Sequence, residues 1–311
     1  MNDKVSFDGI VLIDKDIGET SFDVVRKIKR YSNAYKVGHS GTLDPFATGL
    51  LVILLGQGTK LSNYLMAGEK RYLAKIRLGV ETDTLDLTGR ITRTRSVREI
   101  DREEIEFNIQ RFIGEIEQTP PDYSAVHYNG KRAYKLARKG IKVNLQKRKV
   151  KVFSIDLESI ELPEITLDII CSGGTYIRSL AADLGEQMGT GAHLTALRRL
   201  SSGLFDVNDS LNINEIDQDS FDAVLSEKMI SMSDALYDMK AVQLDSKSFK
   251  NIKNGIKPEW NMIASDAGVS GQYEGFIKLV YDSKLVAVLD ISISQAQDDT
   301  KDWLRKMRVF N

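Results

Sequence analysis

The amino-terminal part of the chain alternates short apolar runs with a segment of helical periodicity. GIVLID at residues 9–14 is typical of a buried strand. Thr20 and Asp23 then stand at the spacing of a capping box, so we expect a helix to begin there. A glycine-rich loop at 38–49 leads into a second buried strand, expected at 50–55.

The middle of the chain combines strands that have one polar face with helices. From residue 72 to 78 apolar residues recur at every second position, which predicts a half-exposed strand. Longer strands are expected at 150–162 and 165–171, with helices at 100–113 and 176–188. Because strands and helices mix without a regular strand–helix–strand repeat, the pattern predicts an α+β fold on a mainly antiparallel sheet.

The carboxyl-terminal part has a different pattern. We expect one helix at 246–254, closed by Gly255 as its C-terminal cap. Three short strands are expected at 276–281, 285–290 and 306–310. These elements predict a separate, small β-rich module whose boundary lies between Asp234 and Val242.

Composition limits the kind of protein. The 311 residues are 42% hydrophobic and 28% charged, ordinary values for a globular protein, and their number suggests about two domains. Cys171 is the only cysteine, which excludes a disulfide framework and fits a reducing compartment and a buried core position. The longest apolar run, at 50–55, is far shorter than a membrane span of about 18 residues. We therefore expect a cytoplasmic protein with no signal peptide and no membrane helix.

Charge is distributed unevenly although the net charge is only −1. Residues 123–155 contain no acid, and residues 215–238 contain seven acids against one lysine. The basic stretch indicates either a surface that binds a polyanion or a solvated surface arm. Its ten cations are Lys131, Arg132, Lys135, Arg138, Lys139, Lys142, Lys147, Arg148, Lys149 and Lys151.

The loop GHSGTLDPFATG at 38–49 is the densest group of residues that could carry chemistry. Asp44 stands directly before Pro45, a pair that commonly starts a helix as N-cap and first residue. It could equally be an exposed carboxylate on a rigid loop, usable as a nucleophile or general base. The two interpretations are compatible, because a capping side chain can still face a substrate.

A second group is the segment SGGTYIR at 172–178. Its two glycines allow close approach of a backbone, and Tyr176 and Arg178 follow. Because arginine keeps its charge, Arg178 could hold a buried carboxylate ionised, and such a pair would lower the pKa of the acid. The alternative is an arginine on the surface at the start of a helix.

Motifs for metals and cofactors are absent from the sequence. The acidic loop at 82–89 lacks the spacing of a calcium loop and is interpreted as a turn with polar self-contacts. His39, His127 and His193 lie in unrelated contexts without metal-site spacing. No phosphate-binding or dinucleotide-binding glycine motif is present, so we expect neither a metal nor a cofactor.

Several ordered blocks together resemble the bacterial tRNA pseudouridine-55 synthase (TruB) family. They are GIVLIDK, GHSGTLDPFATGLL, KRYLAKIRLG, TDTLDLTG, PPDYSAVHYNGKRAYKLAR, SGGTYIRSLAADLG and GAHLTALRRL, and they span nearly the whole chain. The carboxyl-terminal module, ending in LRKMRVF, resembles an RNA-binding PUA domain. Asp16 and Thr190 depart from the family pattern, which usually has proline and cysteine at these positions.

The resemblance implies a fold and two domains. The fold would be that of pseudouridine synthases, with a mainly antiparallel mixed central sheet flanked by helices, plus a PUA-like domain. Residues 1–238 would form the catalytic domain, with an insertion at about 120–150 that clamps RNA, and residues 239–311 the PUA-like domain.

The resemblance also implies roles for individual residues. Asp44 would be the catalytic aspartate, Tyr72 the tyrosine that stacks on the target base, and Tyr176 and Arg178 the remaining catalytic pair. His39 would wedge into the RNA loop. Further RNA-binding or site residues would be Lys15, Asp86, Lys131, Arg132, Arg138, Lys147 and Arg148.

The function implied is conversion of the T-loop uridine of tRNA, position 55, to pseudouridine by base flipping without a cofactor. The partner would be the T-arm stem-loop of tRNA, with no membrane and no obligate protein partner. Three other functions stay open: a tRNA-binding or tRNA-folding protein without catalysis, a hydrolase that uses Asp44 on an N-glycosidic bond, and a pseudouridine synthase for another RNA. A hydrolase that releases free base would leave abasic RNA, whereas isomerisation leaves the mass of the RNA unchanged.

Overall fold

The structure is a computed structural model that describes residues 7–32, 34–216, 219–269, 273–293 and 303–310. Asp217, one of the seven acids of the acidic segment, lies outside these residues. Among the described residues, no helix is long and apolar enough to cross a membrane.

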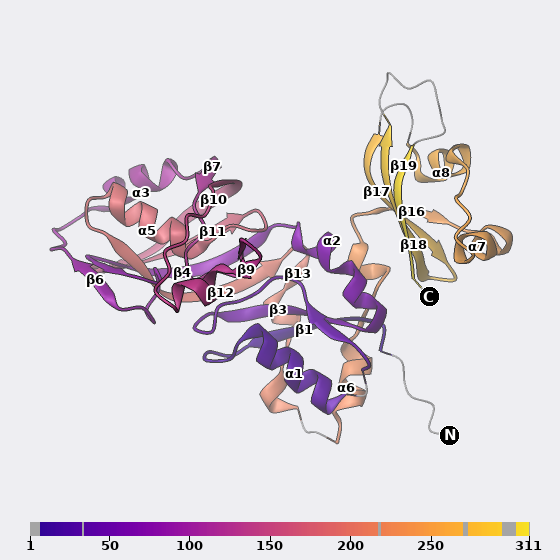
Figure 1. Ribbon diagram of the computed structural model, residues 1–311, viewed down its shortest axis with the longest axis horizontal. Coiled ribbons are helices and arrows are strands. Elements are labelled where there is room, and N and C mark those ends of the chain that lie inside the picture. Colours follow the sequence, from indigo (N-terminus) through magenta and orange to yellow (C-terminus); the bar gives the residue numbers. More distant parts are fainter. Residues whose placement is uncertain (1–6, 33, 217–218, 270–272, 294–302, 311) are drawn as a thin grey trace.

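An eleven-stranded mixed sheet forms the body of the described chain (Figure 1). Its main path runs β14-β1-β3-β12-β4-β11-β10-β7, with β13, β15 and β2 paired beside it. Only the pairs β1–β14 and β3–β12 are parallel, so the predicted α+β fold with a mainly antiparallel sheet is confirmed. The strands are β1 (Gly9–Lys15), β2 (Val37–His39), β3 (Thr48–Leu55), β4 (Lys70–Leu78), β7 (Gly114–Gln118), β10 (Arg148–Glu161), β11 (Glu164–Cys171), β12 (Ala192–Ser202), β13 (Phe205–Asp206), β14 (Leu211–Asn212) and β15 (Ile230–Ser231).

The two strands predicted from apolar runs, β1 and β3, are buried on both faces. Val11 and Ile13 of β1 pack in one core with helix α1 (Ser21–Tyr31). Ile10 and Leu12, which point the other way, pack in a second core that includes Phe310 near the end of the chain. Because both faces are covered, these strands are continuously apolar rather than alternating.

Helices begin where the sequence supplies caps. Thr20 caps α1 with both bonds of the capping box, as its spacing with Asp23 predicted. The helix predicted at 100–113 starts later, after the N-cap Asp101. The other helices of the body are α2 (Ser62–Met66), α3 (Arg102–Gln110), α5 (Ile177–Gln187) and α6 (Phe221–Lys228), with short 3-10 helices η1 (Gly56–Leu61), η2 (Val207–Asp209), η3 (Ile213–Glu215) and η4 (Asp234–Leu236).

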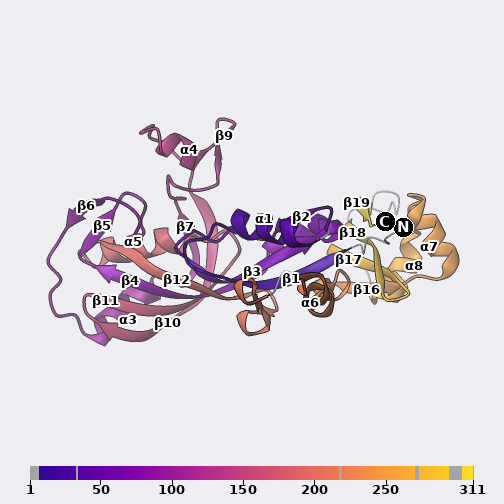
Figure 2. The ribbon, with the colours of Figure 1, turned by 90° about the horizontal axis from the view of Figure 1, so that it is seen from below.

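The basic stretch before β10 forms an arm that projects from the sheet (Figure 2). It contains the small hairpin β8 (His127–Tyr128) and β9 (Lys131–Arg132) and the helix α4 (Ala133–Ala137). Ala133, Val143 and Leu145 form a separate small core inside the arm. A second hairpin, β5 (Val80–Thr82) and β6 (Ile91–Thr94), holds the loop predicted at 82–89.

The carboxyl-terminal region is a four-stranded sheet with two helices. Its strands run in the order β16 (Lys240–Gln243), β17 (Tyr273–Tyr281), β18 (Lys284–Ile293) and β19 (Leu304–Val309). The predicted helix appears as α7 (Ser246–Lys253), followed by Gly255 with φ +80°. The expectation of a single helix is wrong, because α8 (Trp260–Ala267) follows and ends on the left-handed Gly268.

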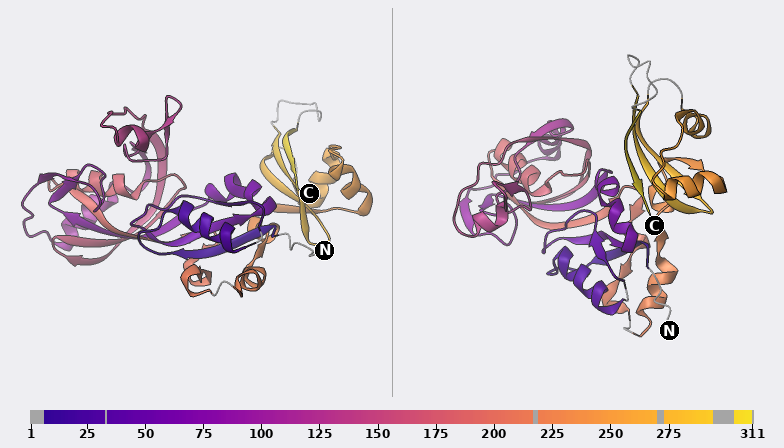
Figure 3. Two further views of the ribbon diagram at one scale, coloured as in Figure 1. Left: turned by 60° about the horizontal axis from the view of Figure 1, so that its bottom comes forward. Right: turned by 45° about the vertical axis from the view of Figure 1, so that its right-hand side comes forward.

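This carboxyl-terminal region packs firmly on the body. Lys278 of β17 donates hydrogen bonds to the carbonyl oxygens of Ser233 and Leu236, both at 2.9 Å. Arg308 of β19 donates to the carbonyl oxygen of Lys60 at 2.9 Å. The arm and this sheet stand at different places along the long axis of the molecule (Figure 3, left).

Candidate active site

Asp44 lies at the start of a tight turn and not at the start of a helix. The amide of Ala47 donates to the carbonyl oxygen of Asp44 at 3.1 Å, with Pro45 as the second residue of the turn. Proline favours this position because its fixed φ suits a β-turn. The interpretation of Asp44 as a helix N-cap is therefore wrong, and its side chain is free to project from the loop.

Three buried groups brace the loop that carries Asp44. The hydroxyl of Ser21 accepts from the amide of Leu43 at 2.8 Å and donates to its carbonyl at 3.1 Å. Arg199, only 1% exposed, donates to the carbonyl oxygen of Thr42 at 3.1 Å. Lys15, fully buried, reaches the carbonyl oxygen of Pro45 at 3.4 Å. The loop is thus tied to α1, β12 and β1.

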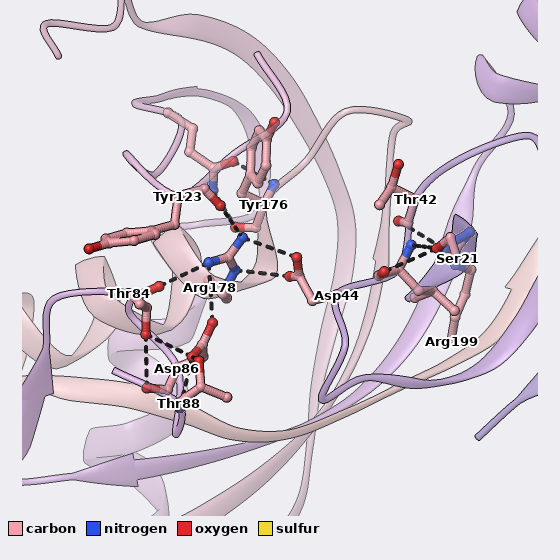
Figure 4. Close-up of polar contacts among 12 residues, drawn as sticks. Ser21, Thr42, Asp44, Thr84, Asp86, Thr88, Tyr123, Tyr176, Arg178 and Arg199 are labelled. Atoms are coloured by element: carbon pink, nitrogen blue, oxygen red, sulfur yellow. Dashed lines mark hydrogen bonds and ion pairs between the residues drawn. The ribbon is translucent and has the colours of Figure 1, made fainter. Parts of the chain in front are cut away.

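Arg178, 4% exposed in the first turn of α5, lies between two carboxylates (Figure 4). Its Nε lies 2.9 Å from Oδ2 of Asp44, and its Nη2 donates to Oδ1 of Asp44 at 3.2 Å. Its Nη1 donates to Oδ2 of Asp86 at 3.2 Å and to the carbonyl oxygen of Thr84 at 3.0 Å. Nη2 also donates to the carbonyl oxygen of Tyr123 at 3.0 Å. The alternative of a surface arginine is wrong.

The electrostatic balance at Asp44 differs from the expectation. About a third of its side chain is exposed (32%). Burial raises the pKa of Asp44 above its ordinary value, Arg178 opposes the rise, and the charge of Asp86 adds to it. Arg178 does act to lower this pKa, as expected, but the net pKa is raised and not lowered, because desolvation is the largest effect and the charge of Asp86 adds to it.

The acidic loop between β5 and β6 makes the polar self-contacts that its sequence predicted, and it also supports Arg178. Oδ1 of Asp86 accepts from the hydroxyl of Thr84 at 2.7 Å and from the amide and hydroxyl of Thr88 at 2.9 and 2.6 Å. Leu85, between Thr84 and Asp86, has a positive φ of 62°. Asp86 is 3% exposed, so its contacts orient the arginine from behind.

Lys15 is likewise an internal residue. Its Nζ donates at 2.8 Å to the carbonyl oxygens of Asp16 and Glu19. Burial lowers its pKa to about 8, against the opposing charges of Glu19 and Asp44. Lys15 and Asp86 are both buried, Lys15 against the Asp44 loop and Asp86 behind Arg178, and neither lies on a surface that RNA could touch.

Tyr72 and His39 are contributed to the site by strands, Tyr72 by β4 and His39 by β2. The guanidinium carbon of Arg199 is 5.8 Å from the centre of the Tyr72 ring. Burial raises the pKa of Tyr72, which keeps its hydroxyl protonated. His39, at the end of β2, has a lowered pKa because of burial and the nearby Arg199, so its ring is neutral near pH 7.

Tyr176 lies at the start of α5, two residues before Arg178. The guanidinium carbon of Arg148 is 4.9 Å from its ring centre, and Nη2 of Arg148 donates to its hydroxyl at 3.3 Å. Arg148 was expected among the RNA-binding residues, and the structure brings it to the aromatic ring of a predicted catalytic residue. Both side chains are half-buried.

The other cations of the basic stretch, most of them in the arm and two in β10, stay on the surface. Nine of the ten are exposed, and only Arg148 is half-buried. Among the described residues, none of the ten forms a salt bridge with an acid. Lys131, Arg132, Arg138 and Lys147 are therefore available to a polyanion.

The described residues contain no group of three or more histidine, cysteine or acidic side chains placed to hold a metal ion. Cys171 is buried in β11, as expected for a core position. Sequence reasoning missed Arg199 and Gln118, two buried polar residues that contact site residues. The only sign of them in the sequence is a polar residue within a strand, and this does not show whether the side chain is exposed or buried against a site residue.

Comparison with known proteins gives matches along most of the chain. Residues 29–177 match the family model described as "TruB family pseudouridylate synthase (N terminal domain)". Residues 178–239 match "tRNA pseudouridylate synthase B C-terminal domain".

Two relatives are named tRNA pseudouridine synthase B. The protein of Geobacter sulfurreducens is 39% identical over 304 residues, which cover 98% of this chain and all of the relative (100%). That of Clostridium kluyveri is 44% identical over 249 residues, covering 80% of this chain and 84% of the relative. Among solved structures, a chain of a Cbf5-Nop10-Gar1 complex aligns with a TM-score of 0.72 at 24% identity, covering 97% of this chain and 84% of that chain. The structural match supports the fold.

Proposed function

The chain belongs to the TruB family of pseudouridylate synthases and is an isomerase, and we propose that it converts uridine 55 in the T loop of tRNA to pseudouridine. Its relatives carry tRNA pseudouridine synthase in their names, which supports tRNA as the substrate. The observation that carries the proposal is the Asp44 carboxylate, partly exposed on a braced loop and held on both oxygens by Arg178.

The reaction needs a reactive carboxylate but no redox partner. The bond between N1 and C1′ breaks, the base turns, and C5 bonds to C1′. The hydrogen on C5 leaves as a proton and N1 regains one, so nothing is oxidised and no group is lost. We assign the carboxylate to Asp44, ionised beside Arg178, and removal of the C5 proton to Tyr176, whose hydroxyl is oriented by Arg148.

The target base must leave the RNA stack before the carboxylate can reach it. Unstacking costs a few kcal/mol, and stacking on an aromatic side chain returns about 1–3 kcal/mol. We assign this stacking to Tyr72, whose ring lies near the guanidinium of Arg199. His39, neutral because its pKa is lowered, would fill the space that the flipped base leaves in the loop.

The basic arm of the protein would bind the phosphates of the T-arm stem of tRNA. Among the described residues its exposed cations form no salt bridge, so they would exchange counterions for RNA without breaking internal ion pairs. We divide the chain into a catalytic domain, 1–238, whose arm spans about 120–150, and a PUA-like RNA-binding domain, 239–311. The four-stranded sheet that starts at β16 supports this division.

The test compares the native chain with Asp44→Asn on a synthetic T-arm stem-loop and on whole tRNA. Pseudouridine is mapped by carbodiimide-dependent stops of reverse transcription, and RNA binding is measured in parallel. We expect one new stop at the T-loop uridine with the native chain, none with Asp44→Asn, and similar binding by both. Asp14→Asn is the matched control, because Asp14 also accepts two hydrogen bonds from one arginine, Arg198, outside the proposed site.

Other outcomes would contradict the proposal in distinct ways. Turnover by a clean Asp44→Asn preparation would remove Asp44 from the catalytic role. Tight binding by the native chain without a stop on either RNA would favour a tRNA-binding or tRNA-folding protein. A stop at another uridine of tRNA would retain the chemistry and move its position.

A further inference from the structure

Gln118 is a buried polar residue with an unusual set of contacts. It ends β7, is 1% exposed, and its side chain forms hydrogen bonds with the main chain of Tyr176 on both sides. Nε2 of Gln118 donates to the carbonyl oxygen of Tyr176 at 2.9 Å, and the amide of Tyr176 donates to Oε1 of Gln118 at 2.7 Å. A carboxamide supplies a donor and an acceptor at one end, so it can satisfy both groups of one residue.

These two bonds fix the main chain at the start of α5. Tyr176 is the N-cap residue of this helix, with an extended backbone (φ −97°, ψ 106°) and no side-chain cap of its own. Its carbonyl oxygen also accepts the first helical bond, from the amide of Leu180 at 3.1 Å. The orientation of Tyr176 therefore sets the direction in which the first turn, with Arg178, begins.

The chain that leaves β7 continues along the same helix turn. The carbonyl oxygen of Thr119 accepts from the hydroxyl of Ser179 at 2.9 Å, and that of Tyr123 accepts from Arg178 at 3.0 Å. Arg148, the partner of Gln118 across β7 and β10, lies against the ring of Tyr176. Hydrogen bonds thus join the segment 118–123, where the arm leaves β7, to the first turn of α5. Gln118 is the first residue of this segment and makes two of these bonds.

We propose that Gln118 is a positioning residue of the reaction, whose carboxamide holds the main chain of Tyr176 so that Arg178 meets Asp44 and the Tyr176 ring meets Arg148. The inference rests on the proposed function. Gln118 has no contact with Asp44, so it acts through Tyr176 and Arg178. Replacing it leaves the amide and carbonyl of Tyr176 without these partners, and the helix start is free to shift.

The first test is Gln118→Leu, which keeps the bulk and removes both hydrogen bonds. A displacement of about 1 Å at a reacting group can cost about 100-fold in rate, so we expect kcat to fall by about that factor while the KM for the RNA is unchanged. Gln187→Leu is the matched control. Gln187 ends the same helix and donates to the side chain of Asn108 at 3.1 Å, far from Arg178 along α5.

The second test, Gln118→Glu, separates positioning from a merely structural role. A protonated glutamic acid can donate to the carbonyl of Tyr176 and accept from its amide, whereas the carboxylate can only accept. We therefore expect the ratio of the kcat of this variant to the native kcat to rise as pH falls, because protonation restores the missing donor. Burial moves the pKa of such a carboxyl upward, into the measurable range.

Each outcome has one meaning. A native kcat for Gln118→Leu, or an equal loss in Gln187→Leu, would overturn the inference, as would a kcat ratio for Gln118→Glu that does not change with pH. Thermal unfolding and circular dichroism show whether Gln118→Leu is folded. If it is not, the pH series of Gln118→Glu alone decides whether Gln118 is a positioning residue. Absence of pseudouridine with the native chain would instead refute the proposed function, so the two failures are distinguishable.

Discussion

Replacing Arg178 by lysine tests whether the geometry of the arginine, and not only its charge, supports catalysis. The guanidinium has five N–H groups and makes five polar contacts, two of them with Asp44. A lysine ammonium has three donors, so at least two contacts are lost. It also acts as a point charge and cannot hold both oxygens of one carboxylate side by side.

The size of the effect follows from these contacts. Each buried acceptor left unpaired costs about 1–3 kcal/mol, so Arg178→Lys should lower the free energy of unfolding by about 2–6 kcal/mol. Because the charge is kept, the further cost of about 3–5 kcal/mol for breaking a buried ion pair should appear only in Arg178→Met. A loosely held Asp44 should lower the rate of the chemical step by about 100-fold.

The assay is single-turnover release of tritium from RNA labelled at C5 of uridine, since this hydrogen must leave when C5 bonds to C1′. Unfolding is measured in urea on the same preparations. Arg198→Lys is the control, because Arg198 donates to both oxygens of Asp14, at 3.0 and 2.6 Å, outside the site. Native tritium release by Arg178→Lys, or an equal loss in Arg198→Lys, would refute the reasoning.

Three further predictions concern pH and salt. If ionised Asp44 is required, the single-turnover rate should fall at acid pH with a midpoint above 3.8, the ordinary pKa of aspartate, because the pKa of Asp44 is raised. Asp86→Asn should move this midpoint to lower pH, and an unchanged midpoint would contradict the effect of the Asp86 charge on Asp44. Replacing Lys139 and Lys142 of the arm by alanine should weaken RNA binding and reduce the slope of log K against log salt by about 0.7–0.9 per lost phosphate contact, so an unchanged slope speaks against the arm. The pKa of Lys15 is about 8 in the folded chain and 10.5 ordinarily, so between these pH values only the unfolded chain binds the proton. The free energy of unfolding of the native chain should therefore rise relative to that of Lys15→Met as pH goes from 8 to 10.5, and a constant difference between the two proteins would contradict this.

The fold could be predicted where local pattern and final environment agree. The apolar runs at 9–14 and 50–55 became strands buried on both faces, and the spacing of Thr20 and Asp23 became a capping box. β12 (Ala192–Ser202) was not predicted, since its cations interrupt any alternation. Arg198 and Arg199 are tolerated there because each meets oxygen acceptors that come from distant parts of the chain.

The site could be predicted only in part, because the contacts that assemble it join residues far apart in the chain. The blocks of the family resemblance pointed to Asp44 and Arg178, and the structure joins them through a contact between residues 134 apart in the chain. Residue type alone did not show that Lys15 and Asp86 are internal, because charged residues are usually exposed. Their burial depends on carbonyl and hydroxyl partners that only the folded chain assembles.

The sharing of one arginine by two acids reconciles two demands on Asp44. A carboxylate paired with its own arginine would be well placed, but its lowered pKa would make it a weak base and a weak nucleophile. Here Arg178 fixes both oxygens of Asp44 while part of its charge is balanced by Asp86, and burial raises the pKa further. In the proposed role, Asp44 would thus be held in place and stay reactive, and the loss of Asp86 should weaken it as a base even though its ion pair with Arg178 becomes stronger.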